Sequence, residues 1–448
     1  MHRLYISIIL FLLFFVSILS HKQVFAQDAA TPRQPDPVPQ SEAAVRKLTL
    51  GECISLAFQN NPGLQIERER IAELENDYRI ASSALYPRLS LSAYYQQLDS
   101  DRIGVLPTMV YSEETLAQAR VKQTLFDGGK SWNNRSAAFS ANEAQKESAE
   151  ASRLDTVLAV SQAYYRVLEA REILRVSETS REQREEFFKL TEAFFKAGRA
   201  TKIELLRAEA QLLDAERSLS QAREAQRLSE LILKKVIGIN LQTAMDIADA
   251  FSAELKEPAG EDVLLQEVMM NNPDLKKAGF LKEQSEASLQ AAMGPYWPEI
   301  SLQGTYGYRD RDVTSWDSEL TAGVFLEWAF FEGGLTKAQV GKARSRASQI
   351  AWSERAVRDQ VQIDLRESLG NLRTAITSVN STRRMVEAQD EAYQASVEFY
   401  KRGKATYLEV LSAQVDLVQA KVTSVRAVAD YQNAGARLDR VVGKRPGS

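Results

Sequence analysis

Apolar and polar residues alternate in four short stretches of the chain. In the first stretch Leu89 and Leu91 alternate with Ser90 and Ser92. A period of two predicts a β-strand with one apolar face, and about nine to eleven residues suffice to cross a membrane at a tilt. The predicted strands cover residues 88–98, 116–126, 299–309 and 319–331 approximately.

Long helices are predicted for most of the remaining chain. No proline occurs between Pro107 and Pro258 or between Pro298 and Pro446. Each of these stretches contains a predicted helix of 66 residues, about 99 Å long, and then a glycine and a returning helix of 36 residues. The long helices cover 130–195 and 335–400, the returning helices 201–236 and 406–441, and two shorter helices 62–86 and 273–297.

The second returning helix carries small and apolar residues at steps of four and three. This spacing is typical of a coiled coil, so it predicts the buried seam of the helix. The combined length of a returning helix and a shorter helix nearly equals the length of one long helix. We therefore expect the two to lie end to end along the long helix. The residues of the predicted seam are Leu411, Val415, Val418, Val422, Val425, Ala429 and Ala436.

The same order of elements occurs twice. The Asn-Asn-Pro motif at 60–62 recurs 211 residues later, and the Phe-x-Gly-Gly motif at 126–129 recurs 205 residues later. A nearly constant offset over several motifs predicts a tandem duplication. We assign residues 48–250 to the first repeat, 251–443 to the second repeat and 444–448 to a short tail.

The first 26 residues have the pattern of a secretory signal peptide. Arg3 precedes an apolar run at 4–19, and Val24 and Ala26 fit the small residues before a cleavage site. The alternative is an uncleaved anchor, but the run is shorter than the roughly 20 residues of a membrane-spanning helix. Residues 27–47 are rich in proline and polar side chains and are predicted to be a periplasmic linker.

Four strands are too few to close a membrane barrel, because such barrels begin at about eight strands. An open sheet edge in lipid would leave backbone groups unpaired at several kcal/mol each. We therefore expect the chain to oligomerise around a channel. Aromatic residues near the predicted strand ends are candidates for the membrane interface, the alternative being a soluble aromatic core. They include Tyr86, Tyr95, Trp297, Tyr306 and Trp328.

Composition excludes most enzyme classes. Of the 448 residues, only His2 and His21 are histidines, both within the predicted signal peptide, and Cys53 is the single cysteine. The mature chain therefore lacks a Ser-His-Asp triad, a Cys-His dyad, a His-containing metal site and an internal disulfide. Over all 448 residues, 60 acidic side chains slightly exceed 56 basic ones without a basic patch, which argues against nucleic acid as a partner. We predict a non-enzyme with no catalytic, cofactor-binding or metal-binding residues.

The ordered motifs resemble those of the TolC-like outer-membrane efflux proteins. The resemblance covers about 48–443 and rests on the opening segment 48–62, the Tyr-Pro and Trp-Pro strand starts, and the doubled Phe-x-Gly-Gly and Gly-x-x-Thr-x-x-Glu motifs. It implies a mostly helical homotrimer whose twelve strands form one β-barrel in outer-membrane lipid, continued by a long α-helical barrel across the periplasm. It also implies a passive exit duct that docks a periplasmic adaptor and an inner-membrane pump. An exported coiled-coil protein without a pore, such as an adaptor, is the competing interpretation.

The resemblance also suggests roles for the two helix reversals. Glycine suits a helix reversal and threonine suits the cap of the returning helix. In the family these tips meet the adaptor, although a capped turn with no further role explains the same residues. Tyr400 and Glu409 match residues of the periplasmic gate, but Ser412 replaces a second acidic residue, and Glu409 also fits a solvated helix carboxylate. The candidate docking residues are Gly198, Arg199, Thr201, Gly403, Lys404 and Thr406.

Overall fold

The computed structural model describes residues 46–97, 113–248, 251, 254–310 and 317–444. The predicted signal peptide, almost all of the predicted linker and most of the predicted tail lie outside these residues. The part from Lys47 onward clusters as one compact unit. None of the described helices is long and apolar enough to cross a membrane.

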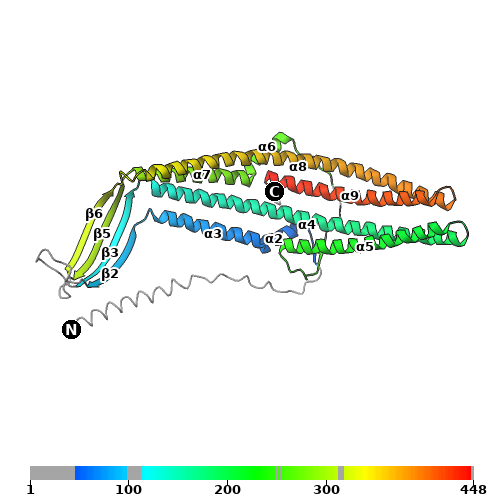
Figure 1. Ribbon diagram of the computed structural model, residues 1–448, viewed down its shortest axis with the longest axis horizontal. Coiled ribbons are helices and arrows are strands. Elements are labelled where there is room, and N and C mark those ends of the chain that lie inside the picture. The colour runs from blue at the N-terminus through cyan, green and yellow to red at the C-terminus, as the bar shows by residue number, and fades with distance from the viewer. Residues whose placement is uncertain (1–45, 98–112, 249–250, 252–253, 311–316, 445–448) are drawn as a thin grey trace, which may run out of the picture. The chain divides into compact units, whose positions relative to one another are not determined.

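Each half of the chain follows the predicted order of elements (Figure 1). Short helices lead into two strands, and a long helix then reverses into a returning helix. The first half contains α2 (Leu50–Asn60), α3 (Pro62–Ser83), α4 (Lys130–Lys196) and α5 (Lys202–Ile237). The second half contains α6 (Glu261–Asn271), α7 (Pro273–Met293), the 3-10 turn η2 (Gly294–Tyr296), α8 (Leu335–Lys401) and α9 (Tyr407–Val442).

The four predicted strands form one antiparallel sheet at one end of the long helices (Figure 1). The strand order is β2-β3-β5-β6, so the β3–β5 pair joins the two halves and β2 and β6 form the edges. The strands are β2 (Arg88–Gln97), β3 (Glu113–Phe126), β5 (Glu299–Asp310) and β6 (Asp317–Glu327).

The predicted end of the fourth strand, near residue 331, is wrong. β6 ends at Glu327, whose partner is Glu299, the first residue of β5. Pro298 precedes Glu299 and has no backbone N–H to donate, so the neighbouring strand cannot continue the ladder. Trp328 therefore follows the strand instead of lying inside it.

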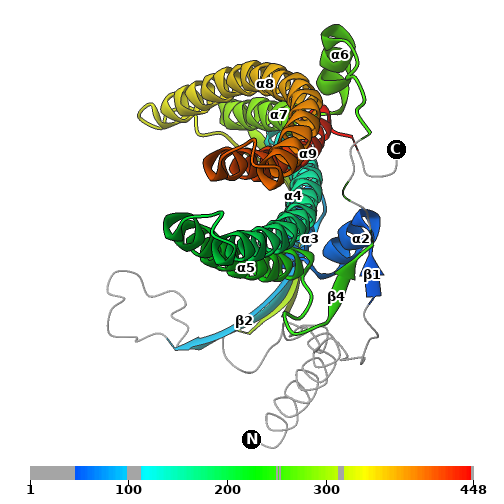
Figure 2. The same cartoon turned by 90° about the vertical axis from the view of Figure 1, so that its right-hand side faces the viewer.

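The short and returning helices lie end to end along each long helix, as predicted. α3 and α5 follow α4, and α7 and α9 follow α8 (Figures 1 and 2). A glycine at the end of α5 lets it approach the end of α2 closely, and a glycine at the end of α9 lets it approach the end of α6. Gly238 and Gly443 end α5 and α9 with positive φ angles of 74° and 80°, and a Cβ on either would lie 2.9 Å from a carbonyl oxygen of Asn60 or Asn271.

Outside this layer, a two-stranded sheet and the short helices α2 and α6 complete the unit. The short strand β1 (Arg46–Leu48) pairs with β4 (Met245–Ile247) next to α2. In Figure 2, α2 and α6 lie on the same side of the long helices. Cys53 is fully buried between α2 and its neighbours, as expected for a small apolar side chain.

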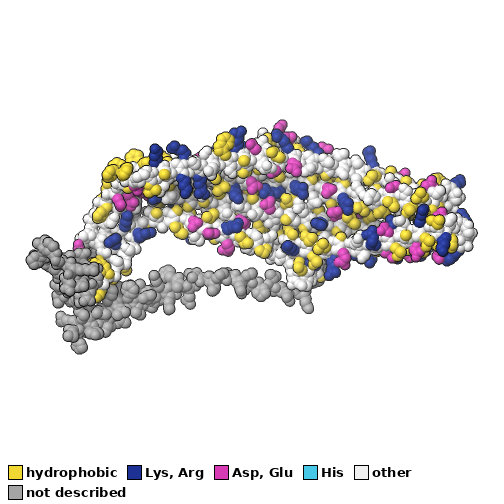
Figure 3. All heavy atoms as spheres, in the orientation of Figure 1, with side chains coloured by type: hydrophobic (Ala, Val, Ile, Leu, Met, Phe, Trp, Pro, Cys, Tyr) yellow, Lys and Arg dark blue, Asp and Glu magenta, His cyan; other side chains and the backbone are white. Residues whose placement is uncertain are grey.

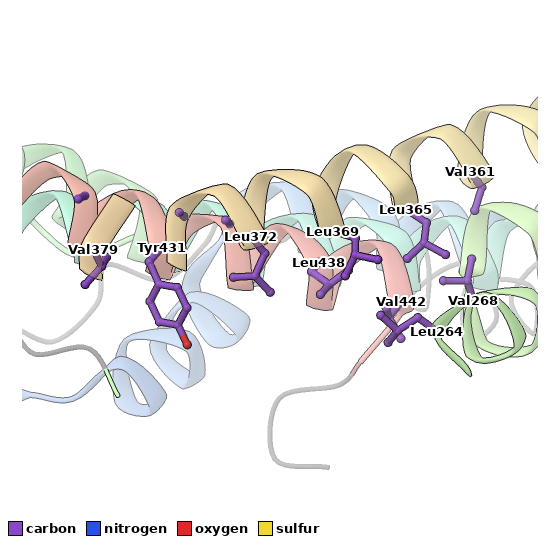
Figure 4. Packing of buried hydrophobic residues seen from close by; sticks show 13 residues of the cluster. Leu264, Val268, Val361, Leu365, Leu369, Leu372, Val379, Tyr431, Leu438 and Val442 are labelled. Carbon is purple, nitrogen blue, oxygen red and sulfur yellow. The ribbon is translucent and has the colours of Figure 1, made fainter. Parts of the chain in front are cut away.

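The predicted seam of α9 is wrong: it is displaced by one position at the start of the helix and by two positions near its end. Its buried residues include Val410, Gln414 and Leu417, whereas only Ala429 of the predicted seam is buried. The apolar pattern of α9 covers more than one face, and within one chain α9 packs against both α8 and α4. The core of the second half instead contains Leu365, Leu369, Leu372, Tyr431, Leu438 and Val442 (Figure 4).

Candidate functional site

One face of the sheet is apolar across all four strands. The pairing places Leu91, Ala119, Tyr306 and Leu320 in one row from β2 to β6. Leu91 is 77% exposed and Leu320 is 75% exposed, although both are apolar. The neighbouring rows on this face add Leu89, Val121, Ala93, Ala117, Tyr308, Leu302, Val324, Ala322, Ile300 and Leu326.

The opposite face of the same sheet is mainly polar. One row on it contains Ser90, Arg120, Thr305 and Thr321. Next to that row, the Lys122 ammonium lies 3.2 Å from a carboxylate oxygen of Glu299. A single sheet therefore presents an exposed apolar surface on one side and a polar surface on the other. Strands that separate lipid from an aqueous lumen have this division.

The five predicted interface aromatics all lie on the exposed surface, between 49% and 70% exposed. Tyr86, Trp297 and Trp328 flank the strand ends next to the helices, whereas Tyr95 and Tyr306 lie farther along the strands. Tyr86 and Tyr95 are separated by about 30 Å of extended chain, or roughly 23 Å across a membrane at a tilt of about 40°. This distance matches the apolar band of an outer-membrane barrel, about 25 Å tall.

The first helix reversal is a glycine turn followed by a capping box. Gly198 has a φ angle of 74°, and the backbone N–H of Arg199 donates to the Phe194 carbonyl at 2.7 Å. The Thr201 hydroxyl accepts from the Glu204 N–H, while the Glu204 carboxylate accepts from the Thr201 N–H at 2.7 Å. The backbone groups at this reversal are thus satisfied locally.

The second reversal repeats the first. Gly403 has a φ angle of 73°, and the Lys404 N–H donates to the Phe399 carbonyl at 2.8 Å. Thr406 caps α9, and the Glu409 carboxylate accepts from the Thr406 N–H at 2.6 Å. Glu409 therefore holds the same capping role as Glu204 in the first repeat.

Tyr400 joins the two hairpins near their tips. Its ring lies 5.4 Å from that of Phe187 and 5.7 Å from that of Phe194, both on α4. Tyr407 on α9 stacks on the same Phe187 ring, with ring centres 5.5 Å apart. Burial raises the pKa of both tyrosines above the usual range. The buried part of this tip cluster consists of Phe187, Ala208, Tyr400, Tyr407 and Val410.

Sequence reasoning did not identify the partners of Tyr400. At the offset of 205 residues, Tyr400 corresponds to Phe195 and Tyr407 to Lys202. The two repeats therefore differ at the positions where they contact each other. The one sequence signal that could have pointed to these partners is the spacing of seven residues between Phe187 and Phe194, which places both rings on the same helix face.

An ion-pair network farther from the tips was also missed. The Arg440 guanidinium on α9 donates to Asp155 on α4 at 2.6 Å and to Asp274 on α7 at 2.9 Å. These hydrogen bonds raise the Arg440 pKa despite desolvation, the largest effect, which lowers it. The Arg440 side chain is only 17% exposed. Since Asp155 belongs to the first half and Arg440 and Asp274 belong to the second, the network links the two halves where their helices meet.

Comparison with known proteins identifies the family. The chain matches the family described as "Outer membrane efflux protein" over residues 53–239 and 264–444. The chain belongs to the outer membrane efflux protein family. As a member, it is an outer-membrane exit duct of an efflux system, as predicted from the sequence. The alternative of a periplasmic adaptor is thereby set aside.

Relatives and solved structures agree with this family. The chain is 25% identical to "Outer membrane efflux protein BepC" of Brucella suis, covering 90% of this chain and 87% of that protein. It is 24% identical to "Nodulation protein T" of Rhizobium leguminosarum, covering 96% of each. The solved outer-membrane channel OprN has the same fold, with a TM-score of 0.82 at 18% identity over 93% of this chain and 98% of OprN. These proteins are named as efflux, nodulation and channel proteins rather than as enzymes.

Proposed function

We propose that three copies of this efflux protein close one twelve-stranded barrel in the outer membrane and form a passive export channel through it. The observation that carries this proposal is the exposed sheet with one apolar and one polar face. Four strands supply only part of a barrel, and a barrel of more than about eight strands leaves room for a channel. The apolar face would meet lipid and the polar face would line the lumen.

The long helices would continue the same channel across the periplasm. α4 and α8, each of 67 residues, would be about 100 Å long. At their far ends, the Gly198 and Gly403 tips are proposed to dock a periplasmic adaptor, which an inner-membrane pump would serve. The energy for transport would then come from the pump, because a passive channel does not itself drive transport.

The residue ranges of the proposed precursor follow from the same account. A cleaved signal peptide at 1–26 would deliver the chain to the periplasm, and the linker at 27–47 would precede the first repeat. The family match in two segments supports the division near residue 250.

Single-channel recording in planar lipid bilayers tests the proposed pore. The purified protein is expected to form long-lived channels, and Arg120→Glu should shift their selectivity toward cations because position 120 faces the lumen. Val121→Thr on the adjacent, lipid-facing position is the matched control and should leave selectivity unchanged. Absence of channels, or an equal effect of both substitutions, would contradict the proposal.

A further inference from the structure

The two outer edges of the sheet carry opposite charges at the same end. Arg88 is the first residue of β2, and Glu327 is the last residue of β6. Both lie on the polar face, because the row through Arg88 ends at Gly323 and Glu327 lies four positions farther along β6. Both side chains are exposed. Neither of them forms an ion pair within the part of the chain that the structure describes.

Each edge charge lies opposite a like charge of its own chain. Arg88 pairs with Lys122 in the ladder, and Glu327 pairs with Glu299. Directly opposed like charges destabilise a sheet. Lys122 and Glu299 compensate each other across the β3–β5 pair at 3.2 Å. Among the residues that the structure describes, this inner ion pair leaves the positive charge on the β2 edge and the negative charge on the β6 edge without a partner.

The sheet ends on a slant at the side of the helices. β6 extends four residues beyond the row of Arg88 toward the helices, so the end of the sheet slants across the strands. Strand tilt in a closed barrel produces such a stagger. If β2 of the next copy starts level with the end of β6, its Arg88 lies opposite or diagonal to Glu327. Long side chains can meet in either arrangement.

The helices beside the two edges of the sheet also carry complementary charges. α3 packs on α4 and has no buried residue, and α8 packs on α7 and α9. Dark blue side chains gather over the start of α8 in Figure 3. Residues 335–353 of α8 carry Lys337, Lys342, Arg344 and Arg346 and no acid. α3 carries Glu67, Glu69, Glu73, Glu75 and Asp77 against Arg68, Arg70 and Arg79.

We propose that Arg88 of one copy forms an ion pair with Glu327 of the next and sets the register of the seam between copies. The occupant of each edge is a second copy of this chain, in a head-to-tail contact that repeats until the ring closes. The basic start of α8 would then face the acidic α3 of the neighbour. This inference rests on the proposed trimeric barrel and adds the residues that select the partner edge.

Charge reversal at the seam tests the inference. The full-length protein is extracted from outer membranes in mild detergent, and the ratio of trimer to monomer is measured by size-exclusion chromatography with light scattering. Arg88→Glu and Glu327→Arg should each lower this ratio about tenfold or more, since each places like charges at three seams. The double variant Arg88→Glu/Glu327→Arg should restore it. Arg120→Glu, a charge reversal on the inner strand β3, is the control and should leave the ratio unchanged.

The possible outcomes separate the two proposals. Trimers at the wild-type ratio in both single variants would overturn the Arg88–Glu327 pair while leaving the barrel intact. The same conclusion follows if the double variant stays as dissociated as the single variants. A wild-type protein that is monomeric in this extract would instead overturn the trimeric barrel itself.

If the basic start of α8 binds anionic lipid rather than α3, Lys342→Glu should reduce binding to anionic vesicles and leave the trimer ratio unchanged. This result would contradict the helical part of the inference.

Discussion

At the scale of single residues, the structure gives Glu409 a defined local role. Its carboxylate caps α9, and Glu204 does the same for α5. The acidic side chain at this position is therefore explained by helix capping in both repeats, without reference to a gate. The hypothesis that Glu409 also forms part of a cation-sensitive gate needs a variant that separates charge from capping.

Glu409→Gln provides this separation, because glutamine can complete a capping box without a charge. We expect Glu409→Gln to keep the amide protection of the tip in hydrogen exchange, whereas Glu409→Ala should lose about 1 kcal/mol of local stability. If Glu409 lines the periplasmic mouth, Glu409→Gln should weaken block by divalent cations in planar bilayers. Glu204→Gln is the matched control. Equal cation block in the wild type and Glu409→Gln would contradict the gate hypothesis.

At the scale of elements, the two hairpin tips have nearly the same geometry. Both turn on a glycine with positive φ, and a Cβ added at Gly198 or Gly403 would meet no atom within 4 Å. Space is therefore free around each tip, and the constraint on these glycines is the backbone conformation alone. An L-residue in this conformation costs about 1–2 kcal/mol.

Gly403→Leu tests the proposed docking role of the tip. It should strain the turn and place a bulky side chain on the docking surface, so pump-dependent resistance should fall while trimers still reach the outer membrane. Gly51→Leu, at an exposed glycine of α2 with free space and no positive φ, is the control and should retain resistance. Full resistance with Gly403→Leu would contradict docking at this tip.

Much of this element structure could be predicted from the sequence. Local signals such as Pro62, the glycines of the reversals and the alternating strand residues placed most element boundaries within a few residues. The end of β6 and the buried side of α9 could not be predicted in the same way. They depend on where β5 begins and on which helices pack against α9, and these are contacts between distant segments.

At the scale of the whole unit, the two repeats share one fold but have different surroundings. Tyr400 and Tyr407 pack against α4, whereas the corresponding Phe195 and Lys202 do not belong to the tip cluster. The duplication in the sequence therefore predicted the elements of both halves but not the contact between them. The Arg440 network is another contact of this kind, because its partners lie 285 and 166 residues away in the chain.

We propose that the exposed, two-faced sheet becomes a sealed pore only when copies of the chain combine. The most direct measurement is the molar mass of the processed protein, extracted from the outer membrane and determined by light scattering with the detergent contribution subtracted. We expect three chains per particle and precipitation when detergent is removed. A single chain that remains dissolved without detergent would contradict this proposal.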